Sequence, residues 1–136
     1  MSKIIALDFG LKRTGLAISD DSQLFAFGLD TIDSQNLMIV LKELFTKENV
    51  STIVLGLPKR LNNENTHITQ NVLLLKEALE KEFILKKVEL LDERFTSKMA
   101  SSAMHKAGAT KKQKMQKGLV DKVSATIILQ DWLGRK

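Results

Sequence analysis

Cysteine and tyrosine are absent from the 136 residues, and there is one proline and one tryptophan. Without cysteine the chain can form no disulfide, no thiolate metal site and no cysteine nucleophile. This composition is typical of the reducing cytoplasm, where we expect the protein to act. The six phenylalanines are dispersed along the chain. The sequence therefore predicts no aromatic platform for stacking nucleic-acid bases.

Long apolar runs are also missing. Acidic residues interrupt the apolar stretches of the first 30 residues, so we expect no secretory signal. No run approaches the roughly 20 apolar residues that a membrane helix needs. The hydrophobic fraction of 43% is ordinary for a globular protein. With no repeat and no linker in view, we predict a single domain over residues 1–136.

Acidic residues are missing from one long segment. Between residues 94 and 120 there is no Asp or Glu, and the basic residues are Arg94, Lys98, Lys106, Lys111, Lys112, Lys114 and Lys117. This segment carries +7 in a chain of net charge +5, so the remainder carries −2. A basic stretch on a nearly neutral body indicates a polyanionic partner such as nucleic acid. The alternative is a loop that only aids solubility.

Apolar periodicity predicts an α/β fold. We expect strands over 3–9, 14–19, 24–32, 51–57 and 87–92. We expect helices over 35–48 with Ser34 as N-cap, from Thr66 to Phe83, over 96–106 and over 119–133. Residues 59–66 and 108–118 are predicted loops. Right-handed crossovers give a five-stranded mixed sheet of order 3-2-1-4-5 with helices on its faces. The small residues Ser124 and Ala125 would let the last helix lie close to that sheet.

Three carboxylates are predicted to meet at one edge of this sheet. Asp8 lies near the end of the first strand, Glu93 follows the fifth, and Asp121 lies near the start of the last helix. The first and fifth strands lie about 10 Å apart across the fourth, which ends in Gly56 and leaves the gap open. Oxygen-only ligands favour Mg²⁺ or Mn²⁺. Two such ions about 4 Å apart would stabilise the attacking and leaving oxygens of a phosphodiester displacement.

Each carboxylate also has a purely structural interpretation. Asp8 could form the turn before Gly10, Glu93 could pair with Arg94, and Asp121 could complement a helix dipole. Three carboxylates that gather without a cation would repel one another. The joint arrangement therefore favours a catalytic metal site made by Asp8, Glu93 and Asp121.

Four segments carry a resemblance to a known family: "ALDFGLKRTGLAISD", "IVLGLP", "LLDERFTS" and "KGLVDKVSATIILQDWL". In this order and spacing they resemble the YqgF family, Holliday-junction-resolvase-like proteins assigned as pre-16S ribosomal RNA nucleases. The resemblance implies a ribonuclease H-like fold, an acidic triad of Asp8, Glu93 and Asp121, and a basic loop over 106–118. The chain departs from the pattern at Met99, where relatives often carry glutamate. It also has Gly56, Leu57 and Pro58 at the positions where related nucleases of better-understood chemistry often carry a carboxylate.

The resemblance implies a metal-dependent nuclease that processes the 5′ end of precursor 16S ribosomal RNA, with structured RNA favoured over branched DNA. Two alternatives stay open: a junction-resolving DNA endonuclease, which would need a dimer, and a non-catalytic RNA-binding factor of ribosome assembly. A weak homodimer is compatible with either. The residues predicted to contact phosphates are Arg13, Arg94, Lys106, Lys111, Lys112, Lys114 and Lys117. The strand-turn-strand at Asp8 is also typical of actin-like ATPases, but the chain is too short for their second lobe.

Overall fold

The computed structural model describes residues 2–57, 67–92 and 117–134. Its elements are β1 (Lys3–Phe9), β2 (Arg13–Ser19), β3 (Ala26–Asp33), η1 (Ser34–Asn36), α1 (Leu37–Lys47), β4 (Val50–Leu57), α2 (His67–Glu82), β5 (Lys87–Asp92) and α5 (Lys117–Gly134). The predicted loop over 59–66, the helix over 96–106 and nearly all of the loop over 108–118 lie outside the described residues. Every other predicted strand and helix is present.

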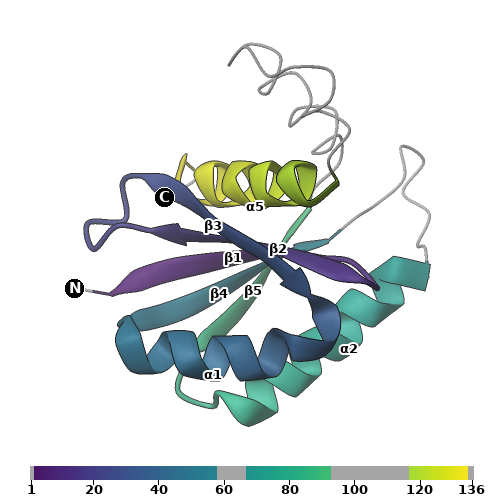
Figure 1. The fold of residues 1–136 in the computed structure, drawn as a ribbon. Helices are drawn as coiled ribbons and strands as arrows, with labels where there is room; N and C mark the ends of the chain where they lie inside the picture. Colours follow the sequence, from purple (N-terminus) through teal and green to yellow (C-terminus); the bar gives the residue numbers. More distant parts are fainter. Residues whose placement is uncertain (1, 58–66, 93–116, 135–136) are drawn as a thin grey trace.

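The five strands form one sheet of order β3-β2-β1-β4-β5, which confirms the predicted topology. β1 pairs antiparallel with β2 and parallel with β4, and β4 pairs parallel with β5. Figure 1 shows α5 on one face of the sheet and α1 and α2 on the other. The parallel strands β1, β4 and β5 therefore end at a common edge, and the first turns of α5 lie over the same edge (Figure 1).

The sheet separates two apolar clusters. On the α1 and α2 face, Ile5 and Leu7 of β1 join buried residues of both helices, and on the α5 face, Ile4 and Ala6 join Ala125, Ile128 and Leu129. Successive residues of a strand point to opposite faces, so this division follows directly from the continuous apolar run of β1. Trp132 of α5 is partly buried and packs against the cluster on the α5 face.

The start of the first helix differs from the prediction. Ser34 is not the N-cap: it begins the 3₁₀ turn η1, and α1 follows with Asn36 at its N-cap and no side-chain cap bond. The Ser34 hydroxyl instead donates to the carbonyl oxygen of Gly10 and lies 2.8 Å from Thr14 Oγ1. A serine before a helical pattern predicts an N-cap from local sequence. Here the Ser34 hydroxyl is instead engaged in a hydrogen bond with Gly10, which lies 24 positions away in the chain.

Two further boundaries differ by two residues. β3 begins at Ala26 and not at Leu24, because the Asp20 carboxylate accepts the backbone N–H groups of Leu24 (2.8 Å) and Phe25 (3.0 Å) and closes a turn there. α5 begins at Lys117, two residues before the predicted start. Asp121 therefore lies inside the helix, one turn beyond its first residue.

No helix in the described ranges is long and apolar enough to span a bilayer.

Candidate functional site

Asp8 is a half-buried carboxylate near the end of β1. It follows the four fully buried residues from Ile4 to Leu7 and has the same parity as Ile4 and Ala6, whose side chains contact α5 residues. Alternation along the strand therefore directs the Asp8 side chain to the α5 face. The prediction that Asp8 lies at the edge where the parallel strands end is confirmed by the strand register.

Glycines flank Asp8 on both neighbouring strands. On β2 its register partner is Gly15. On β4, Leu55 pairs with Leu7, so Gly56 is the next residue along, beside Asp8. Neither glycine carries a side chain that would cover the carboxylate from the side. The register places Gly56 beside Asp8, as predicted, and it adds Gly15 as a second neighbour without a side chain, which the sequence alone does not indicate.

Arg13, the first residue of β2, lies on the same face as Asp8. Arg13 is two and four residues before Gly15 and Ala17, so its side chain points to the same face of β2 as theirs, and Ala17 belongs to the cluster on the α5 face. Because Asp8 pairs with Gly15, Arg13 is the diagonal neighbour of Asp8 in the hairpin. Its Nε atom is buried and has no hydrogen-bond partner among the described residues. A buried donor without a partner is costly unless a ligand satisfies it. Arg13 is thus a cationic donor held beside the candidate carboxylate.

The turn that joins Asp8 to Arg13 is tightly built. A Cβ placed on Gly10 would lie 2.6 Å from the carbonyl oxygen of Arg13, so a side chain there would push the backbone apart. Ser34 closes the turn from outside: besides the two contacts of its hydroxyl, its backbone N–H donates to the Lys12 carbonyl oxygen at 2.9 Å. Thr14, which meets the same hydroxyl, is fully buried. These contacts, which the sequence pattern does not reveal, fix the spacing between Asp8 and Arg13.

α5 lies close to the sheet where small residues allow it. Ser124 and Ala125 are buried, with exposed fractions of 1% and 0%, as their size predicts. The Ser124 hydroxyl has no hydrogen-bond partner among the described residues. Asp121 precedes Ala125 by one helical turn, and Lys117 is the first residue of α5. The side chains of Asp121 and Lys117 are not among the parts that the structure describes.

The remaining predicted site residues lie outside the described ranges: Glu93, Arg94, Lys106, Lys111, Lys112 and Lys114. Glu93 directly follows Asp92, the last residue of β5. Among the side chains that the structure does describe, no three His, Asp or Glu residues gather as a metal-ligand set. The described part of the site therefore consists of Asp8, Arg13, the two flanking glycines and the turn that Ser34 holds.

Comparison with known proteins identifies the family. The family model described as "RuvX: Holliday junction resolvase" matches residues 2–135. The chain belongs to the RuvX family. This result confirms the resemblance to YqgF proteins that the four sequence segments indicate.

RuvX relatives match along the whole chain. A protein of Flavobacterium psychrophilum is 45% identical over 136 residues, which cover 100% of this chain and 99% of the relative. A protein of Bacteroides thetaiotaomicron is 46% identical with the same coverage. Both carry the name "Putative pre-16S rRNA nuclease".

Solved structures support the RuvX fold. Thermus thermophilus RuvC in complex with a Holliday junction has a TM-score of 0.60 at 13% identity, over 98% of this chain and 97% of that one. Fowlpox virus resolvase with its junction DNA has a TM-score of 0.58 at 13% identity and the same coverage. At this identity the likeness concerns the fold, and it confirms the predicted ribonuclease H-like architecture.

Proposed function

We propose that this chain is a divalent-metal-dependent nuclease that hydrolyses phosphodiester bonds of structured RNA, and that it processes the 5′ end of precursor 16S ribosomal RNA in the cytoplasm. One domain over residues 1–136 carries the activity. The observation that supports this most strongly is the sequence identity of 45% and 46%, along the whole chain, to relatives named for that reaction. The half-buried carboxylate of Asp8, near the end of β1, is the kind of group that binds the metal ion such a reaction needs.

Asp8, Glu93 and Asp121 are the proposed metal ligands and catalytic residues. Their donor set consists of carboxylate oxygens only, which suits Mg²⁺ or Mn²⁺. Asp8 is half-buried between Gly15 and Gly56, and neither glycine places a side chain beside the carboxylate. A cation held there would neutralise the charge that develops on the reacting oxygens of the phosphodiester.

Arg13 is proposed to hold the substrate phosphate. Its buried Nε lacks a partner among the described residues, and a phosphate oxygen would satisfy that donor. The guanidinium also adds positive charge beside the carboxylates. Arg94 and the lysines of the basic stretch would then follow the nucleic-acid backbone away from the cut, and would contribute affinity with little base discrimination.

The family description favours one alternative, a DNA endonuclease that resolves Holliday junctions. Such an enzyme must cut two strands in a symmetric manner and therefore needs a dimer. Removal of a single 5′ extension needs one active site only. A non-catalytic RNA-binding factor is the third possibility, and it differs from both by the absence of cleavage.

A cleavage assay separates these possibilities. The purified protein is incubated with an RNA hairpin that carries a 5′ extension and with a four-way DNA junction, each with Mg²⁺, Mn²⁺ or EDTA. We expect metal-dependent cleavage of the RNA, and loss of more than about 100-fold in rate for Asp8→Asn, since even the outer partners of metal ligands are worth 10- to 100-fold. Asp21→Asn, the same change at an exposed aspartate, is the matched control and should cut normally.

Preferred cleavage of the junction, with paired cuts, would select the resolvase. Binding of RNA without cleavage under any metal condition would select the assembly factor. Activity of Asp8→Asn equal to that of the Asp21→Asn control would remove Asp8 from the site.

A further inference from the structure

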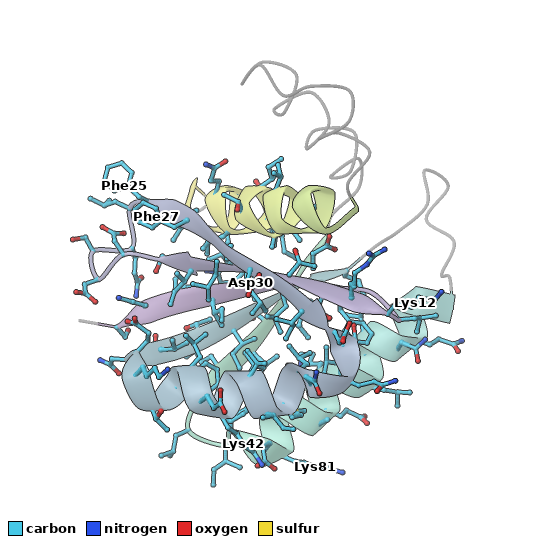
Figure 2. The ribbon with its side chains drawn as sticks, viewed as in Figure 1. Lys12, Phe25, Phe27, Asp30, Lys42 and Lys81 are labelled. Atoms are coloured by element: carbon cyan, nitrogen blue, oxygen red, sulfur yellow. The ribbon has the colours of Figure 1, made fainter. Side chains whose placement is uncertain are left out.

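The turn between β1 and β2 presents two side chains to solvent immediately after the candidate carboxylate. Leu11 has an exposed fraction of 66%, and Lys12 is exposed as well. Lys12 forms none of the ion pairs found among the described residues, which join Lys3 to Glu48, Lys42 to Glu82 and Lys76 to Glu80. Figure 2 places Lys12 at the outer tip of this hairpin, at the edge where β1 ends.

The exposure of Leu11 and Lys12 is built into the fold. Ser34 fixes the carbonyl oxygens of both Gly10 and Lys12, and its hydroxyl also meets the buried Thr14. Gly10 has no room for a side chain because of the Arg13 carbonyl oxygen. The backbone on either side of Leu11 is therefore anchored. A side chain on an anchored turn loses little conformational entropy when it meets a ligand.

The turn offers both an apolar group and cationic groups, the two kinds of group that contact the bases and the phosphates of a nucleic-acid strand. Leu11 is apolar, Lys12 is an unpaired cation, and Arg13 is a half-buried cation with an unsatisfied donor. A single exposed leucine is common on protein surfaces. Leu11 differs from such residues because it lies three positions from Asp8 and next to two cations. A nucleic-acid backbone alternates phosphates with sugars and bases, which offer apolar faces.

We propose that the turn Gly10–Arg13 is a substrate-contact element: Leu11 packs against the base next to the scissile phosphate and displaces it from its stack, and Lys12 binds a flanking phosphate. Ser34 acts as the positioning residue that holds the turn. This inference rests on the proposed nuclease function, because it takes the edge at Asp8 as the place of cleavage. It adds two contacts that neither the basic stretch nor the carboxylates provide.

The test measures binding in EDTA, so that cleavage does not contribute. The probe is an RNA hairpin with a 5′ extension that carries 2-aminopurine at the junction of the single and double strands. We expect the wild type to raise the 2-aminopurine fluorescence, since an apolar side chain between bases unstacks them. Leu11→Ser should abolish that rise and weaken binding about tenfold, the value expected for partial burial of a leucine.

Matched controls lie elsewhere on the molecule. Leu24, with an exposed fraction of 68%, is in the turn at the opposite end of β2, so Leu24→Ser should bind as the wild type does. Lys12→Ser should lower the slope of log affinity against log salt by about 0.7, the value for one phosphate contact on a single strand. Lys47→Ser, at the exposed C-terminal end of α1, should leave the slope unchanged. Ser34→Ala should weaken binding, and Ser34→Thr, which keeps the hydroxyl, should restore it.

Binding and fluorescence of Leu11→Ser and Lys12→Ser equal to those of their controls would overturn this inference while the nuclease assignment stands. If the wild type binds neither this RNA nor the corresponding DNA, the proposed function fails, and the inference fails with it. A Lys12 effect on the salt slope with normal 2-aminopurine fluorescence in Leu11→Ser would also contradict it, because the apolar contact is its central element.

Discussion

At the residue scale, Gly10 is a position that has no room for a side chain. Its absent Cβ would lie 2.6 Å from a backbone oxygen, and backbone atoms cannot move aside as a flexible side chain does. We expect Gly10→Ala to lower the free energy of unfolding by about 1–3 kcal/mol, the usual cost of overpacking. Urea denaturation measures this change through a lower transition midpoint at unchanged slope.

The control for Gly10 is Gly134, the last residue of α5. A Cβ there meets no atom within 4 Å. Gly134→Ala should leave stability unchanged or raise it by up to about 1 kcal/mol, since alanine favours the helix. Equal destabilisation by both substitutions would contradict the close approach at Gly10.

Among the candidate site residues, Asp8 is the one whose place in the fold the sequence predicts best, because a carboxylate at the end of an apolar strand is a local pattern. Arg13 is predicted to contact phosphate, but its buried unsatisfied Nε depends on neighbouring strands and appears only in the structure. The contacts of Ser34 with Gly10 and Thr14 join residues 20 or more positions apart. Local sequence holds no signal for them.

At the element scale, the order of the strands is predictable because β1, β2 and β4 have clear apolar runs, β3 follows β2 in a hairpin, and crossover chirality fixes the rest. The ends of elements are harder to predict, because side-chain bonds decide them. β3 begins late since the Asp20 carboxylate binds the N–H groups of Leu24 and Phe25, and Gln23 takes a positive φ of 58° in the same turn. Neither feature has a periodicity that a sequence pattern could reveal.

The Asp20 turn gives a pH dependence of known sign. The backbone N–H of Phe25, followed by that of Leu24, holds the pKa of Asp20 below its ordinary value of 3.8. A lowered pKa means that the contribution to stability is present above pH 3.8 and is lost as the pH falls through the folded-state pKa. We therefore expect Asp20→Ala to be less stable than the wild type at pH 7, and the difference to shrink below pH 3.8.

Thermal melts between pH 7 and pH 2.5 measure this difference. Asp21→Ala removes a neighbouring exposed carboxylate for which no such bonds are found, and it serves as the control. A stability difference between wild type and Asp20→Ala that stays constant over the whole range would contradict the role of the ionised Asp20 carboxylate in the turn.

At the scale of the whole molecule, charge is distributed unevenly along the chain. The segment 94–120 holds seven basic residues and no acid, whereas the rest is slightly acidic. If this segment binds phosphates, replacing Lys106, Lys111, Lys112, Lys114 and Lys117 by serine should flatten the salt dependence of RNA binding by about 0.7 per lost contact. Filter binding or fluorescence anisotropy at several salt concentrations measures the slope.

A variant of equal net charge provides the control for that experiment. Serine replaces five lysines of α1, α2 and β5, namely Lys42, Lys47, Lys76, Lys81 and Lys87. This control variant should keep the wild-type slope of log affinity against log salt, because only lysines that contact phosphates release condensed counterions. If both variants lower the salt dependence of RNA binding equally, the segment 94–120 makes no specific phosphate contacts and serves only solubility.

The central claim is that Asp8, Glu93 and Asp121 together hold a divalent cation, and thermal melting with and without Mn²⁺ tests it without a substrate. Without metal the three carboxylates repel one another, so Asp121→Asn should melt no lower than the wild type. A cation that binds only the folded state stabilises it by about 2.7 kcal/mol at a hundredfold excess over its dissociation constant, or about 10 °C for a chain of this length.

The account predicts this gain for the wild type, and a much smaller gain for Asp8→Asn, Glu93→Gln and Asp121→Asn. If Asp121 only complements the helix dipole, Asp121→Asn should cost up to roughly 1 kcal/mol without metal and respond to Mn²⁺ as the wild type does. A lower melting temperature without metal, together with an equal response to Mn²⁺, would contradict the metal site.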